Sequence, residues 1–292
     1  MDEGRRSLYA QLGETQQIAV RGGCCFAAIH PARPEVGAIG AWEGDQRPLR
    51  AAEAWLRERG CAVAQGPMEL STWFPYRAAE GPWEQAPFFG EPVEPIGRWR
   101  EAGYREVGWY SSALAPHRLV ADRGRALGRA LRAEGWTLSS PGVGADGRIG
   151  EAAYREAVAL LHQLSHAAFA QARAFAPLPE PALQAWYAPL RPLVRAPLVW
   201  VARAPDGAVG GFSLGLPDPG TRRFLLKTLA VLPAHRRIGV GAWLVGHTHE
   251  QAAALGFSAG VHCLMADESH SRAISRYGGR VFRRYALLER GL

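Results

Sequence analysis

The stretch Leu229-Ala230-Val231-Leu232-Pro233-Ala234-His235-Arg236-Arg237-Ile238-Gly239-Val240-Gly241-Ala242 decides how the second half of this chain folds. An apolar segment typical of a buried strand ends at Val231, and a segment typical of a helix begins near Ala242. Glycine permits a positive φ and a close backbone approach, so successive N–H groups between strand and helix can converge on one anion. The helix N-terminus adds its dipole and its unpaired donors. The stretch therefore suits a pyrophosphate, and an ordinary tight strand-to-helix turn is the alternative reading of the same glycines.

Two common nucleotide motifs do not fit this turn. The P-loop requires Gly-Lys-Ser/Thr, where this chain has Gly241-Ala242-Trp243, and the Rossmann fingerprint requires a third glycine where Leu244 stands. The segment instead resembles the acyl-CoA motif of the GNAT superfamily, Gln/Arg-x-x-Gly-x-Gly/Ala, with Arg236, Gly239 and Gly241 at the matching positions. The resemblance covers the second half of the chain, from residue 136 to residue 290.

The elements predicted for the second half agree with the fold that this resemblance implies. Asp206-Gly207 predicts a hairpin between two of the strands. The expected fold class is α/β (α+β), with a mixed, mostly antiparallel central sheet flanked by helices. In chain order we expect a strand at 136–140, helices at 151–175 and 178–193, strands at 198–203, 208–216 and 224–231, a helix at 242–255, a strand at 259–265, a helix at 269–276 and a strand at 281–288.

The first half resembles a degenerate copy of the same fold. Its segment Gly66-Pro67-Met68-Glu69-Leu70-Ser71-Thr72-Trp73 is similar to one found in some two-domain GNAT proteins, which suggests a tandem architecture. The segment 37–42 enters the first-half helix without an Arg-x-x-Gly-x-Gly pattern, so we expect no CoA site there. The predicted divisions are a degenerate domain at 1–115, a linking helix at 116–135 and an acyltransferase domain at 136–292.

The resemblance also implies how an acyl-CoA binds. The strand that ends at Val231 is expected to bulge and splay from its neighbour, so that the pantetheine arm pairs with main-chain groups. A backbone N–H near Val231 then faces the thioester oxygen, and one such donor contributes about 3 kcal/mol. Acetyl-CoA or another acyl-CoA is the expected co-substrate, and no metal is expected. The implied contact residues are Leu229, Ala230, Val231, Arg236, Arg237, Ile238, Gly239, Val240, Gly241 and Ala242.

The catalytic residues depend on the register of the late helix. In the family an acid is often a tyrosine in Asn-x-x-Ala-x-x-x-Tyr, and in one register Tyr277 takes that position, with His270 in place of the asparagine. A second register aligns Gly278-Gly279 with the glycine that ends the helix and puts Ile274 at the tyrosine position. Both registers stay open. The candidate bases are His262, Asp267 and Glu268, with Asp218 as a further carboxylate.

Two other motifs suggest different chemistry. Gly211-Phe212-Ser213-Leu214-Gly215 spells a serine-hydrolase motif, but Pro217 and Pro219 follow where that motif needs a helix. His162 and His166 have helical spacing, but residue 163 is glutamine and no third metal ligand is apparent. A long loop rich in aromatic residues makes Trp73 and Tyr76 candidates for contact with the acceptor.

The bulk properties predict a soluble cytoplasmic protein. The formal charge of +7 comes from arginine, because Lys227 is the only lysine. No apolar run approaches the roughly 18 residues of a membrane span, and the four cysteines have neither metal nor disulfide spacing. No nucleic-acid module is apparent. We expect an acyl-CoA-dependent N-acyltransferase that transfers directly to an amine in a ternary complex, with a non-catalytic CoA-binding scaffold as the alternative. The oligomeric state is left open.

Overall fold

The computed structural model describes residues 3–81, 86–142 and 148–292. The chain forms two compact units. The N-terminal unit comprises residues 1–110, 172–178 and 283–292, and the C-terminal unit comprises residues 111–171 and 179–282. Among the helices of the described ranges, none combines the length and the apolar character that crossing a membrane requires.

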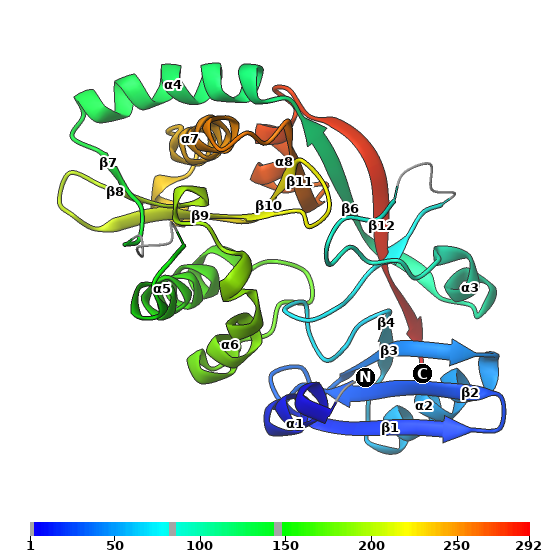
Figure 1. The fold of residues 1–292 in the computed structure, drawn as a ribbon. Coiled ribbons are helices and arrows are strands. Elements are labelled where there is room, and N and C mark those ends of the chain that lie inside the picture. Colours follow the sequence, from blue (N-terminus) through cyan, green and yellow to red (C-terminus); the bar gives the residue numbers. More distant parts are fainter. Residues whose placement is uncertain (1–2, 82–85, 143–147) are drawn as a thin grey trace. The chain divides into compact units, whose positions relative to one another are not determined.

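The C-terminal unit contains a mostly antiparallel sheet between two layers of helices. Its strands β7, β8, β9 and β10 are antiparallel neighbours, and β11 lies parallel to β10. Figure 1 shows α5 and α6 on one side of β8–β10, with α4 and α7 on the other. The predicted fold class is confirmed. The strands are β7 (Thr137–Ser139), β8 (Val199–Arg203), β9 (Val209–Pro217), β10 (Arg223–Val231) and β11 (Ala259–Ala266); the helices are α4 (His117–Ala133), α5 (Glu151–Phe169), α6 (Glu180–Tyr187), α7 (Val240–Ala254) and α8 (His270–Ser275), with short 3₁₀ helices at Ala188–Leu193, Ala196–Leu198 and Pro233–His235.

Helix α4 packs on α7 through glycines. A Cβ built at Gly124 would lie 2.5 Å from the Cα of Gly246, and a Cβ at Gly128 would lie 2.3 Å from the indole nitrogen of Trp243. Only residues without side chains allow the two backbones to approach so closely. Helix α4, which lies within the range 116–135 predicted as a linking helix, is part of the C-terminal unit.

The N-terminal unit repeats the same succession of elements. Strands β1, β2 and β3 are antiparallel neighbours, and α2 connects β3 to the parallel strand β4. In the C-terminal unit, α7 connects β10 to β11 in the same way. A short helix follows the parallel strand in both. The elements are α1 (Glu3–Leu12), β1 (Glu14–Val20), β2 (Gly23–Ile29), β3 (Val36–Gly44), α2 (Gln46–Glu58), β4 (Val63–Gly66), β5 (Ala78–Ala79) and α3 (Ile96–Glu101).

Each unit is completed by a strand from the other half of the sequence. Strand β12 (Arg280–Gly291) pairs with β4, from Leu288 opposite Gly66 to Gly291 opposite Val63. Residues 111–115 of β6 (Arg105–Ala115) belong to the C-terminal unit, where β6 is the neighbour of β11. The division of the chain in space thus differs from the continuous ranges 1–115 and 136–292 suggested by the sequence.

We expect the last strand to stabilise the N-terminal unit. Leu288 is fully buried in its core, so Leu288→Ala should lower the free energy of unfolding by about 2–5 kcal/mol. Val93 is 60% exposed, and Val93→Ala should change the same quantity by less than about 0.5 kcal/mol. Chemical denaturation measures both, and hydrogen exchange locates the loss. If protection were lost only in β8–β11 and not in β4, the pairing of β12 with the N-terminal unit would be contradicted.

Candidate functional site

Strands β10 and β11 diverge half-way along their length. Their parallel pairing runs from Arg223 opposite Ala259 to Leu226 opposite His262. A bulge at Lys227 follows, between Leu226 and Thr228 in the register with β9. Within the described residues, the rest of β10 pairs with β9 alone. The bulge that the resemblance implies is therefore present, and the main chain of residues 229–231 is not in a ladder with β11.

The turn after β10 orients main-chain N–H groups toward one place. Arg237 and Gly239 both have positive φ, 68° and 105°, and Gly239 is the N-cap of α7. The first hydrogen bond into the helix runs from Trp243 N to Gly239 O, at 2.9 Å. The amides of residues 240–242 precede that bond and are the unpaired donors of the first turn. This backbone has the form of a nest, which favours an anion.

Arg236 holds the turn in place. Its Nε donates to the carbonyl oxygen of Val231 at 3.2 Å, and a terminal nitrogen donates to the carbonyl oxygen of Ala168 at 2.7 Å. Ala168 lies in the last turn of α5, where a cation also interacts favourably with the helix dipole. The Arg236 side chain thus joins β10 to α5, and the neighbouring Arg237, which is exposed, is the cation closest in sequence to the nest.

Helices α4 and α8 pack against this turn. A Cβ at Gly241 would lie 3.0 Å from Ile274 Cδ1 and 3.4 Å from Val231 Cγ2. A Cβ at Gly239 would lie 3.3 Å from Leu127 of α4. The residues predicted to contact CoA thus lie on β10, on the turn that follows it and on the first turn of α7, with α4 and α8 beside them. We call the region bounded by β10, the first turn of α7 and α8 the slot.

The two registers of α8 place different residues beside the slot. Ile274 contacts Gly241 and packs with Leu229 in the same apolar cluster. Tyr277 follows the helix end, is 53% exposed, and lies beneath the guanidinium of Arg123 at 3.3 Å from its ring centroid. The structure thus places Ile274, the residue at the tyrosine position of the second register, against the slot.

His262 lies inside a chain of buried hydrogen bonds. Its Nε2 is 2.8 Å from Nε2 of His249, and its Nδ1 is 3.0 Å from Oγ of Ser275. His249 continues the chain to His117 at 3.1 Å. Burial lowers the pKa of His262 to about 4 and that of His249 well below its ordinary value, with His262 and His117 lowering the latter further. Both nitrogens of His262 are therefore engaged, and its ring is not positioned to act on a substrate directly.

The candidate carboxylates have different surroundings. Asp267 accepts a hydrogen bond from Ser111 Oγ at 2.8 Å, and Arg272 lies 3.9 Å from it. Asp218 is buried and paired with Arg223 at 2.8 Å, so it stabilises a turn. Glu268 is exposed between β11 and α8. Of the carboxylate candidates, Glu268 is the most accessible.

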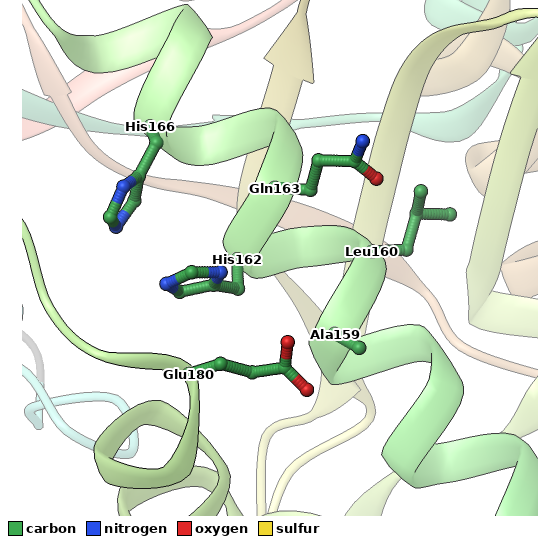
Figure 2. Close-up of a pocket in the computed structure, with 6 residues that line it drawn as sticks. All are labelled: Ala159, Leu160, His162, Gln163, His166 and Glu180. Carbon is green, nitrogen blue, oxygen red and sulfur yellow. The ribbon is translucent and has the colours of Figure 1, made fainter.

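The two alternative motifs lie elsewhere in the C-terminal unit. Ser213 is in the middle of β9, fully buried, with its Oγ 3.1 Å from Thr248 Oγ1, so the strand-to-helix turn of a serine hydrolase is not formed. Figure 2 shows His162, His166 and Glu180 together on one side of α5. They line a cavity of about 550 Å³. In the described ranges, no group of three or more His, Cys, Asp or Glu side chains can hold a metal ion.

Trp73 and Tyr76 are packed within the N-terminal unit. The indole nitrogen of Trp73 donates to the carbonyl oxygen of Ala176 at 2.9 Å. The ring of Tyr76 meets that of Tyr110 edge-on at 5.7 Å and carries the guanidinium of Arg77 on its face. Within this unit both aromatic residues therefore have packing roles.

The N-terminal unit closes the place that corresponds to the slot. Past its parallel pairing with β4, β3 is bonded by the loop that follows β4, because Met68 N donates to Ile39 O at 2.8 Å. A Cβ at Gly40 would lie 2.8 Å from Met68 O. At the start of α2, the carboxylate of Asp45 accepts a hydrogen bond from Arg47 N. A side chain of the protein therefore occupies the position where α7 could bind an anionic ligand.

Part of the chain is similar to a known protein family. Residues 159–277 match the model of the acetyltransferase (GNAT) family. A search of curated protein sequences found no match.

Three solved structures share the fold. A glucosamine N-acetyltransferase region in a fungal multi-domain GH3 β-N-acetylglucosaminidase aligns at 15% identity and TM-score 0.58, over 99% of this chain and 35% of that one. A GCN5-related N-acetyltransferase from Sphaerobacter thermophilus aligns at 15% identity and TM-score 0.52, over 91% and 76%. A tandem GNAT protein from the clavulanic acid biosynthesis pathway aligns at 12% identity and TM-score 0.54, over 100% and 88%.

The buried histidines predict a pH-dependent stability. Because the pKa of His262 is lowered on folding, the unfolded chain binds more protons, and stability is lost as the pH falls from about 6.5 toward about 4. Between pH 7.5 and pH 5, His262 alone should remove about 2 kcal/mol from the free energy of unfolding. Chemical denaturation at both pH values measures this loss, which should be smaller by a similar amount in His262→Gln. An equal loss in both proteins would show that His262 is not held neutral.

Proposed function

We infer that this protein, whose residues 159–277 form a domain of the acetyltransferase (GNAT) family, is an acyl-CoA-dependent N-acyltransferase. The observation that carries the inference is the divergence of β10 and β11 beside the unpaired first-turn amides of α7. Such a divergence leaves room for an extended arm, and the amides suit the pyrophosphate at its end. We propose direct transfer to an amine acceptor in a ternary complex, with acetyl-CoA as the donor of first choice.

The chain supplies the contacts that such a donor requires. The amides from Arg237 to Ala242 would hold the pyrophosphate, and the exposed Arg237 side chain adds a positive charge. The main-chain groups of residues 229–231 would pair with the pantetheine arm. Val231 contributes its N–H more readily than its carbonyl oxygen, because that oxygen already accepts from Arg236. Ile274 and Leu229 would exclude water from the arm.

The reaction makes two demands on proton transfer. An alkyl amine has a pKa near 10, so presenting it unprotonated at neutral pH costs roughly 4–5 kcal/mol. We propose Glu268 as the group that takes this proton, directly or through one water, since the other carboxylates are paired. A thiol has a pKa of about 8.5, so the sulfur can leave as a thiolate without a strong acid. A backbone N–H near Val231 would stabilise the charge on the carbonyl oxygen.

The cavity beside α5 is our proposed site for part of the acceptor. Glu180 and the imidazoles of His162 and His166 line it (Figure 2). A carboxylate suits a cationic amine, and imidazoles suit hydroxyl or amide groups. Ala168, two residues after His166, accepts a hydrogen bond from Arg236. Helix α5 therefore lines the cavity and also contacts the turn between β10 and α7.

Acyl-CoA binding tests the proposal. Calorimetry with acetyl-CoA and with CoA should give one site per chain, because the N-terminal unit fills the corresponding place with its own groups. In Gly241→Val the added side chain meets Ile274 and Val231, and the affinity should fall by about tenfold or more. Gly150→Val is the matched control, since a Cβ at Gly150 meets nothing within 4 Å. Lack of millimolar binding by the wild-type protein would exclude this function; tight binding without transfer to any amine would favour a scaffold.

Substitution of Tyr277 distinguishes the two registers of α8. Tyr277→Phe keeps the ring beneath Arg123 and removes only the hydroxyl. Because Ile274 is the residue that contacts Gly241, we expect kcat to stay within about twofold of the wild type. A decrease of about 10²-fold or more with unchanged acyl-CoA affinity would instead identify Tyr277 as the general acid.

A further inference from the structure

Four side chains that lie far apart in the sequence form one line of hydrogen bonds inside the C-terminal unit. His117 comes from the first residue of α4, His249 from α7, His262 from β11 and Ser275 from the last residue of α8. Successive polar atoms are 3.1, 2.8 and 3.0 Å apart. His249, His262 and Ser275 are buried, and His117 is half-buried.

The direction in which each hydrogen bond of this line donates is fixed by the bond that His117 makes at one end of it. His117 Nε2 lies 3.0 Å from the carbonyl oxygen of Phe257, which can only accept, so His117 carries its proton on Nε2. In a neutral ring Nδ1 is then an acceptor, and His249 must donate to it from its own Nδ1. The same argument makes His262 donate from Nε2 to His249.

The hydroxyl of Ser275 must therefore donate to Nδ1 of His262. Burial lowers the pKa of all three imidazoles, so the rings stay neutral at neutral pH and this single orientation persists. Two apolar residues also neighbour these rings: Leu226 is opposite His262 in the sheet, and the ring of Phe224 contacts His249. Within the described residues, the ring nitrogens of His249 and His262 bond only to one another, to His117 and to Ser275, and not to a charged side chain.

The line ends at the wall of the slot. His262 is the last residue of β11 that pairs with β10 before the strands diverge. Ser275 is adjacent to Ile274, whose side chain contacts Gly241 at the first turn of α7 and packs with Leu229. Helix α8 has only six residues, so it depends on contacts of this kind to keep its place.

We propose that His117, His249 and His262 are positioning residues that fix Ser275, and through it α8, at the distance from α7 that admits the acyl-CoA arm. The proposal rests on the proposed function of the slot. It assigns a role to His262, whose two ring nitrogens are both bonded, so that this residue acts through Ser275 and not on the substrate. It also explains why a hydroxyl is buried at the end of α8.

The test compares two buried hydroxyls of the same unit. Ser275→Ala removes the bond between His262 and α8. Ser213→Ala removes a bond of the same kind, between β9 and Thr248 of α7, which does not involve α8. Both variants should lower Tm to a similar extent. Only Ser275→Ala should also weaken CoA binding, by about tenfold in calorimetry, and raise KM for acyl-CoA with kcat changed less than about threefold.

A conservative variant gives a graded control. The thiol of Ser275→Cys donates more weakly than the hydroxyl, so the CoA affinity of this variant should lie between those of the wild type and Ser275→Ala. In the wild-type protein, ¹⁵N NMR of the imidazoles should show protons on Nε2 of His117, Nδ1 of His249 and Nε2 of His262. This measurement does not require any variant to fold.

The outcomes are separable. CoA affinity in Ser275→Ala equal to that in Ser213→Ala would overturn the positioning role while leaving the proposed function intact. Opposite tautomers would overturn the orientation of the line. Failure of the wild-type protein to bind CoA would overturn the proposed function, and the positioning role with it.

Discussion

The divergence of β10 from β11 is the constraint on which the rest of the site depends. Up to Leu226 and His262 the two strands satisfy each other's main-chain groups, and beyond them they do not. Helix α7 begins at Val240, and Gly241 in its first turn lies beside Val231 at the end of β10, so the first-turn amides lie next to the part of β10 that has left β11. Arg236 secures the turn from one side, and the contact between Gly124 and Gly246 secures the helix from the other.

The N-terminal unit shows what the same succession of elements does without that opening. Its loop bonds Met68 to Ile39, whereas the corresponding part of β10 pairs within the described residues with β9 alone. Asp45 supplies an intramolecular carboxylate at the start of α2. A backbone donor that is already bonded offers little to a ligand, because exchanging one hydrogen bond for another contributes little net free energy. The difference between the two units therefore lies in a few local groups and not in the fold.

Features that depend on neighbouring residues could be predicted from the sequence. The turn Gly239-Val240-Gly241 and the order of the elements are local, and both agree with the structure. The pairing of Leu288 with Gly66 could not be predicted, since nothing in either segment specifies its partner. The same is true of the line from His117 to Ser275. Isolated histidines suggest bases or ligands, and only their arrangement in space shows that they bond to one another.

The central claim is that acyl-CoA occupies the slot of the C-terminal unit. Hydrogen exchange with and without CoA tests it residue by residue. The account predicts that CoA slows exchange of the amides of residues 237–242 and 229–231, because the ligand would bond there. Exchange in β3 and at the start of α2 should not change, because their groups already have intramolecular partners. Protection at β3 and α2, with none at residues 237–242, would contradict it.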